Sequence, residues 1–161
     1  MRKTLVIAPI LLLLAGLSPA ASEENGEHVS RAGNIRIVHP WARAAKAGDN
    51  TLVFMEIENA ADVDTLTGAA SEAAAAARII GITLKDGASA TQEIGPIEIP
   101  KGDFDLDPGG VAIELVGLKS SLAKGHEIEV ELRFETAGDV HLHVEVEAAD
   151  ATRHSHAGHA H

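Results

Sequence analysis

Residues 107–118, Asp-Pro-Gly-Gly-Val-Ala-Ile-Glu-Leu-Val-Gly-Leu, contain the pattern that decides the fold. Pro108 presets its φ angle, and Gly109 and Gly110 can adopt positive φ without steric cost, so the segment predicts a turn. An alternating run follows, which is typical of a strand. One face of this run carries Val111, Ile113 and Leu115, and the other carries Ala112, Glu114 and Val116.

Alternation of the same kind recurs along the chain and is clearest in the last hairpin. Residues 128–134 and 140–146 alternate on either side of an Ala137-Gly138 turn. Matching the apolar faces of the two strands sets their register. The predicted cross-strand pairs are Phe134–Val140, Arg133–His141 and Glu131–His143.

One segment lacks this alternation, because residues 73–77 are five consecutive alanines, for which intrinsic propensity predicts a helical turn. Elsewhere the chain has several short strand patterns, with turn signals about every ten residues and no long helical pattern. These patterns predict an all-β antiparallel sandwich or barrel.

Composition divides the chain into four parts. Residues 1–20 combine the basic Arg2 and Lys3 with an apolar run and a small-residue cleavage site, which predicts a signal peptide and a periplasmic or secreted protein. Residues 21–33 are polar and patternless, and we expect a flexible lead-in. We expect residues 34–147 to form one domain and residues 148–161 to form a disordered, His-rich tail.

Composition also excludes several classes of function. The formal net charge of −11 at pH 7 disfavours binding to nucleic acid, and to anionic membrane after signal cleavage. The sequence contains no cysteine, so it predicts neither a disulfide framework nor a lipid-bearing thiol. No nucleophile–base pair or carboxylate pair stands out among the scattered acidic residues, and we do not expect an enzyme.

Several ordered motifs resemble one known family. They are Pro40-Trp41-Ala42-Arg43, Ile57-Glu58-Asn59, Asp64-Thr65-Leu66, Pro108-Gly109-Gly110 and Gly117-Leu118-Lys119. In this order they resemble the PCu(A)C copper-chaperone family of bacterial periplasmic proteins, over roughly residues 34–146. The resemblance implies a cupredoxin-like β-sandwich with Greek-key connections. It also implies delivery of copper toward respiratory oxidase assembly, with Sco-type proteins as partners.

The copper ligands of that family do not carry over to this chain. The family pattern places them at Ile80, near Thr91, at Ala112 and at Glu114. None of these residues is a Cys, Met or His, which are the donors that Cu(I) favours. Met55 is the only methionine after the signal peptide, and it alternates with core positions, so we expect it to pack in the core. The usual Cu(I) site is therefore predicted to be absent.

Histidine side chains remain as candidate metal ligands. Four of them lie in the tail, at His154, His156, His159 and His161, and two share one face of the last strand, at His141 and His143. Imidazoles on a flexible segment can wrap around a borderline cation, which favours Cu(II) over Cu(I), with zinc or nickel as alternatives. The tail could instead be a solvated segment without a ligand, and the strand pair an exposed polar face.

The sequence as a whole predicts a periplasmic protein that binds copper or a similar divalent cation, as a chaperone or a buffer. Its ligands would come mainly from the tail, and the missing Cu(I) ligands favour capture of Cu(II) over delivery of Cu(I). The alternative is a non-metal protein-interaction module of the same fold that has lost its metal site.

Overall fold

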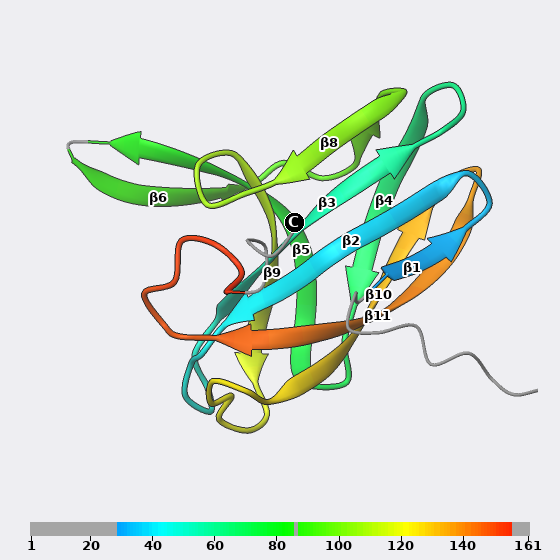
Figure 1. The fold of residues 1–161 in the computed structure, drawn as a ribbon. Helices are drawn as coiled ribbons and strands as arrows, with labels where there is room; N and C mark the ends of the chain where they lie inside the picture. Colours follow the sequence, from blue (N-terminus) through cyan, green and yellow to red (C-terminus); the bar gives the residue numbers. More distant parts are fainter. Residues whose placement is uncertain (1–28, 86, 156–161) are drawn as a thin grey trace, which may run out of the picture.

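A computed structural model describes residues 29–85 and 87–155, and this part of the chain is all-β (Figure 1). The strands are β1 (Val29–Ala32), β2 (Ile35–Arg43), β3 (Thr51–Asn59), β4 (Asp64–Ala70), β5 (Ala74–Lys85), β6 (Ala88–Glu93), β7 (Ile97–Ile99), β8 (Gly102–Leu106), β9 (Val111–Leu118), β10 (Glu127–Phe134) and β11 (Gly138–Glu147). The prediction of an all-β fold is confirmed. Within the described ranges, no helix has the length and apolar character needed to cross a membrane.

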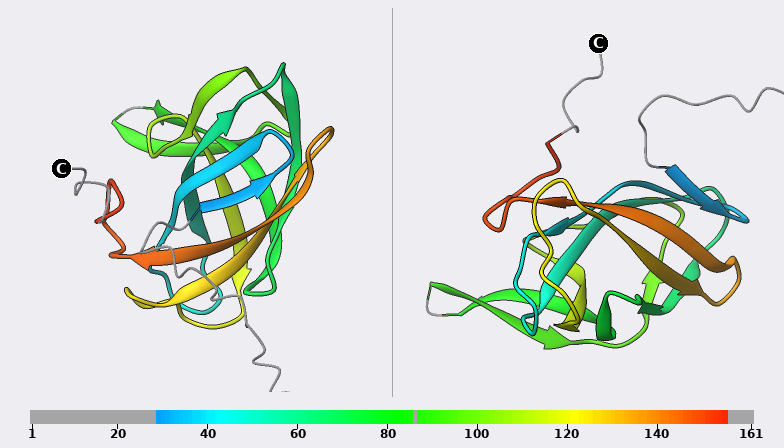
Figure 2. Two further views of the ribbon diagram at one scale, coloured as in Figure 1. Left: turned by 45° about the vertical axis from the view of Figure 1, so that its right-hand side comes forward. Right: turned by 90° about the horizontal axis from the view of Figure 1, so that it is seen from below.

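The strands form one 11-stranded sheet in the order β6-β5-β9-β3-β2-β11-β10-β4-β7, with β1 paired to β2 and β8 paired to β3. The sheet folds over on itself, so that β10 and β11 lie opposite β5 and β9 (Figure 2). Inward-facing side chains such as Ile37, Ile113 and Leu142 are fully buried between the two halves. Met55 is 4% exposed in the same core, as predicted. The alternation of apolar residues thus produces the expected sandwich.

The turn before β9 forms as predicted, but its glycines serve a different purpose. The N–H of Gly109 donates to Oδ1 of Asp107 at 2.6 Å, and the N–H of Gly110 donates to the Asp107 carbonyl at 3.2 Å. Neither glycine has positive φ. A Cβ at Gly109 would lie 3.3 Å from Oδ1 of Asp107, so a side chain at this position would crowd the carboxylate that accepts the hydrogen bond.

Four of the five alanines, residues 74–77, lie in β5, so the predicted helical turn is wrong. Ala74 lies opposite Leu118 and Ala77 opposite Leu115 in the antiparallel β5–β9 ladder. A Cβ on Gly117, whose φ is +64°, would lie 3.5 Å from the Cβ of Ala75. Pairing with a central strand outweighs the helical propensity of alanine, and small side chains suit the close approach of the two backbones.

The last hairpin forms with a register two residues away from the predicted one. Phe134 lies opposite Gly138, and the other pairs are Leu132–Val140, Glu131–His141 and Glu129–His143. The chain reverses through residues 135–137, and Asp64 accepts the N–H groups of Thr136 and Ala137, each at 2.9 Å. Because the shift is even, each side chain keeps its predicted face. Apolar matching alone could not distinguish the two registers.

Two predicted boundaries differ from the structure. Residues 29–32, expected in a flexible lead-in, form β1 and pair with β2 between Val29↔Val38 and Ala32↔Ile35. Residues 148–155, expected in a disordered tail, turn back over the sheet after β11 (Figure 1). We call residues 148–155 the C-terminal strap. The predicted signal peptide and residues 156–161 lie outside the described residues.

Candidate metal centre

The outward-facing side of β11 carries polar residues that become more buried toward the end of the strand. The side chains of His141 and His143 are 78% and 59% exposed, whereas that of Glu147 is 2% exposed. This end of β11 runs parallel to β2, with Glu145 opposite Trp41 and Glu147 opposite Arg43. The C-terminal strap supplies the remaining cover.

The C-terminal strap is held on β2 and β11 by polar contacts. Nε of Arg43 donates to the carbonyl oxygen of Ala151 at 2.9 Å. The N–H of Ser155 donates to Oε1 of Glu147 at 2.8 Å, and its hydroxyl donates to the same oxygen. Ala151 also packs on a small apolar cluster that includes Trp41. These contacts fix the position of the intervening His154.

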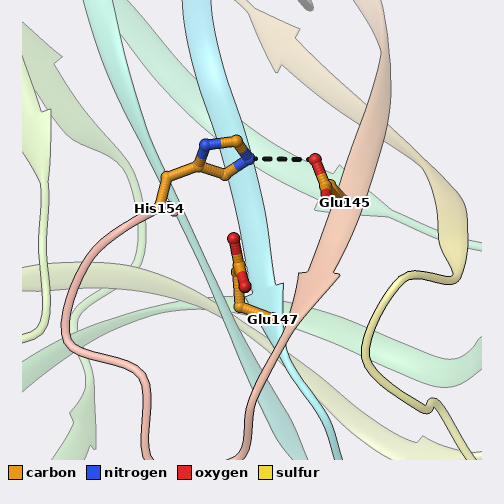
Figure 3. A group of neighbouring side chains, drawn as sticks. All are labelled: Glu145, Glu147 and His154. Carbon is orange, nitrogen blue, oxygen red and sulfur yellow. Dashed lines mark ion pairs between the residues drawn. The ribbon is translucent and has the colours of Figure 1, made fainter. Parts of the chain in front are cut away.

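His154 lies beside two carboxylates of β11 (Figure 3). Its Nε2 is 3.3 Å from Oε2 of Glu145, and its side chain is 4% exposed. One ligand atom from each of Glu145, Glu147 and His154 lies within 4.8 Å of the other two. We call these three residues the candidate metal centre, because one cation could contact a nitrogen and two oxygens there.

Glu147 is ionised at neutral pH. Burial by itself raises the pKa of Glu147, but the hydrogen bonds from Ser155 and the ammonium of Lys124 outweigh it, so the pKa lies below its ordinary value. Nζ of Lys124 is 3.4 Å from Oε2 of Glu147. The centre therefore offers a negatively charged oxygen donor without a proton to displace.

The donor types indicate which cations the centre could hold. Imidazole with carboxylates suits Zn(II), Cu(II) and other borderline or hard divalent cations, whereas Cu(I) requires softer ligands. Three protein donors leave at least one coordination position for another imidazole, water or an incoming ligand. The arrangement therefore brings together three side chains that could hold a divalent cation.

The histidines predicted as ligands are found in different environments. His154 lies in the candidate metal centre, while His156, His159 and His161 lie outside the described residues. Nε2 of His141 is 3.9 Å from Oε2 of Glu131, and Nδ1 of His143 is 3.0 Å from Oε1 of Glu127. These two strand histidines do not join the centre.

Glu145 and Glu147 were not predicted as ligands from the sequence. A signal was present, since both follow His141 and His143 at alternate positions on the same face of the strand. What distinguishes them is the return of the C-terminal strap, and no periodic pattern in residues 148–155 predicts that return. The burial of these carboxylates is thus a tertiary feature.

The positions that the family pattern assigns to Cu(I) hold no soft ligand. Ile80 and Ala112 lie opposite each other in the β5–β9 ladder and are fully buried with Trp41 and Phe54. Oε2 of Glu114 accepts from Nε of Arg78 at 2.6 Å. An apolar cluster and an ion pair therefore occupy this region, and their side chains do not fit the chemistry of Cu(I).

Comparisons with known proteins agree with this fold. A family profile described as "Putative lipoprotein LpqE-like" matches residues 35–146. A relative from Leifsonia xyli subsp. xyli, named "Putative lipoprotein Lxx21020", is 34% identical over 134 residues, which are 80% of this chain and 78% of the relative.

Solved structures of PCuAC domains are also similar. The copper-bound PCuAC domain from PmoF2 is 29% identical with a TM-score of 0.63, and the match covers 75% of this chain and 98% of that domain. The apo form of the PmoF2 domain is 29% identical with a TM-score of 0.63, and covers 78% of this chain and 99% of that one. The predicted cupredoxin-like fold is thereby confirmed.

Proposed function

The chain belongs to the LpqE-like family of PCuAC-type domains, and from this premise we propose that it captures or buffers Cu(II), or a similar divalent cation, outside the cytoplasm. The names of its relatives support an extracytoplasmic site, since one is described as a lipoprotein. The copper-bound state of the PmoF2 domain supports copper as the cargo. The proposed role is binding, without catalysis.

The observation that carries the proposal is the candidate metal centre. Glu145 and Glu147 belong to the last strand of the domain, and His154 belongs to the strap, so one cation would join the two. We propose that His156, His159 and His161 add nitrogen ligands from beyond the strap, as the tail pattern predicts. His141 and His143 would provide only weaker binding on the exposed face.

Capture of Cu(II) fits the ligands better than delivery of Cu(I). The resemblance to copper chaperones implied transfer toward respiratory oxidase assembly through Sco-type partners. Transfer of Cu(I) depends on soft ligands that can exchange, whereas Ile80 and Ala112 offer none. We therefore propose storage or scavenging as the role of this chain, with zinc or nickel as alternative cargo.

The proposal is tested by titrating Cu(II) and Zn(II) into two truncated chains and the full chain. One chain lacks residues 154–161 and the matched control lacks only residues 156–161. We expect the control to retain one tight site and the shorter chain to lose it. Binding is followed by calorimetry and by the fluorescence of Trp41, the single tryptophan, which lies opposite Glu145.

Unchanged stoichiometry and affinity in the chain lacking residues 154–161 would contradict the proposal. Absence of any tight cation from the full chain would favour the alternative, a protein-interaction module of the same fold. Metal analysis of protein taken from its native compartment distinguishes the same two functions independently of the titration.

A further inference from the structure

His39 has a backbone conformation that is uncommon for a residue other than glycine. Its φ is +49°, and it is the one non-glycine residue with positive φ among residues 29–85 and 87–155. In this conformation the Cβ of an L-residue approaches a carbonyl oxygen, so the surrounding structure must impose it. The cause is a bulge in β2, where the register with β3 shifts between Val38 and Trp41. Bulges of this kind re-aim a side chain.

The bulge brings His39 to the outer side of the sheet, where the C-terminal strap lies. His39 lines a cavity of about 220 Å³ that is also lined by Trp41 and His154. The ring centroids of His39 and His154 are 6.2 Å apart, and the ring planes are inclined by 31°. His39 therefore lies beside the imidazole of the candidate metal centre, on the side formed by β2.

We propose that His39 is the fourth ligand of the candidate metal centre, which then binds its cation through two imidazole nitrogens and two carboxylate oxygens. This inference rests on the proposed function and specifies its ligand set. The cation would connect β2, β11 and the C-terminal strap, which supply His39, the two glutamates and His154. Rigid strands supply three of the ligands, and a rigid support favours a defined geometry.

The distance between the imidazoles is compatible with a shared cation. With metal–nitrogen bonds of about 2 Å, two imidazoles on one cation have ring centroids about 5 to 6 Å apart. The observed 6.2 Å is close to this range. Two nitrogen and two oxygen donors suit Cu(II) or Zn(II).

The charge around the cavity favours a cation as well. Glu56, Asp105 and Asp107 line the same cavity, together with one cationic side chain, that of Arg153. Glu56 lies directly opposite Asp105 in the β3–β8 ladder. Burial, and then the carboxylates of Asp105, Asp103 and Glu58, raise the pKa of Glu56. A concave surface lined by negative charge concentrates cations near it.

The test uses His39→Asn and His39→Gly in a full chain that also carries H156Q, H159Q and H161Q. Asparagine tolerates positive φ and glycine adopts it without strain, so both variants remove the imidazole and keep the bulge. We expect Cu(II) affinity to fall at least about tenfold. In electron paramagnetic resonance spectra, the number of nitrogens coupled to Cu(II) should fall from two to one. The melting temperature of the metal-free protein should stay unchanged or rise.

The matched control is His126→Asn, which changes an exposed histidine in the loop before β10 and should alter neither readout. An unchanged affinity and nitrogen count in both His39 variants would overturn the assignment. A fall in the melting temperature of both metal-free variants would also overturn it, because His39 would then serve the fold. If the H156Q/H159Q/H161Q chain itself bound no Cu(II), the proposed function would fail and this assignment with it.

Discussion

The β5–β9 region around Ile80 and Ala112 and the end of β11 around Glu145 and Glu147 use one scaffold in opposite ways. In the first region, two of the positions that the family pattern assigns to copper, Ile80 and Ala112, hold apolar side chains at 0% exposure. In the second, carboxylates and an imidazole are brought together under a strap. The difference shows that side chains of ligand type can gather away from the position that family resemblance indicates.

The two regions also differ in their relation to the family. The family match covers residues 35–146, so it includes the whole β5–β9 region. Glu147 and the C-terminal strap lie beyond that match. The fold therefore belongs to the family, whereas part of the candidate metal centre is contributed by residues that the family match does not cover.

The largest expected effect comes from removing the carboxylates of the second region. Because they are direct ligands, E145Q with E147Q should lower Cu(II) affinity by at least the roughly hundredfold that loss of an outer-shell partner can cost. Calorimetric titration measures the change. E129Q with E135Q removes the same charge at exposed positions and is the control. If both double variants lost the same Cu(II) affinity, the cause would be the smaller net negative charge and not the loss of ligands.

Ala112→His tests the first region by placing a ligand where the family pattern expects one. Ala112 is fully buried against Ile80 and Trp41, so the larger side chain should destabilise the fold by about 2 kcal/mol through overpacking. Cu(I) affinity should not rise, because the described residues that form this cluster with Ala112 include no Cys, Met or His. Urea denaturation and a Cu(I) competition assay check the two outcomes. Tight Cu(I) binding by this variant would contradict our conclusion that the region around Ile80 and Ala112 lacks the ligands of a Cu(I) site.

A substitution at Asp64 should change the stability of the fold without changing metal binding. Burial raises the pKa of Asp64, but backbone N–H groups of Thr136, Thr65 and Ala137 outweigh it, so the pKa lies below 3.8. D64N should cost about 1.5 kcal/mol at pH 7, because three donors lose a charged acceptor. The strand geometry of β11 places this turn about 30 Å from the candidate metal centre, so Cu(II) affinity should stay unchanged.

The same carboxylate makes stability depend on pH in one direction. Since its folded pKa is depressed, its contribution is complete above the ordinary value of 3.8 and is lost as pH falls through the lower folded value. The difference in unfolding free energy between wild type and D64N should therefore be constant at neutral pH and shrink below pH 3.8. Denaturation curves across this range check the sign.

The smallest effect is expected at the exposed end of β11. H141Q with H143Q should change Cu(II) affinity less than about threefold, because solvent screens these side chains and each already has a glutamate partner. The same titration serves as the measurement. A loss as large as that of E145Q with E147Q would show that the strand histidines belong to the tight site.

Much of the fold could be predicted because local patterns and tertiary structure agree. Residues 128–134 and 140–146 alternate in sequence and pair in the structure. The alanine run was predicted wrongly because its strand forms only against β9, and propensity carries no information about that partner. The secondary structure was predicted correctly where the local sequence pattern and the tertiary pairing favour the same element.

The candidate site could be predicted only in part. The histidine pattern identified His154, because imidazole is an obvious ligand type. Glu145 resembles the other outward-facing glutamates of the hairpin in sequence, and only the strap makes it different. The role we propose for His39 depends on a bulge and on the neighbouring strap. Contacts between segments that lie far apart in the chain were beyond any local pattern.

The pairing of β11 with β2 has a consequence for how the protein is made. Among the ladders of the described residues it is the one parallel pair, and it joins Trp41 to Glu145, positions near the two ends of the domain. Contacts between such distant segments form late, because closing the long loop costs entropy first. The candidate metal centre therefore assembles only after β2 and β11 have paired. Under the proposed function, a cation would bind the folded protein and not a partly folded chain.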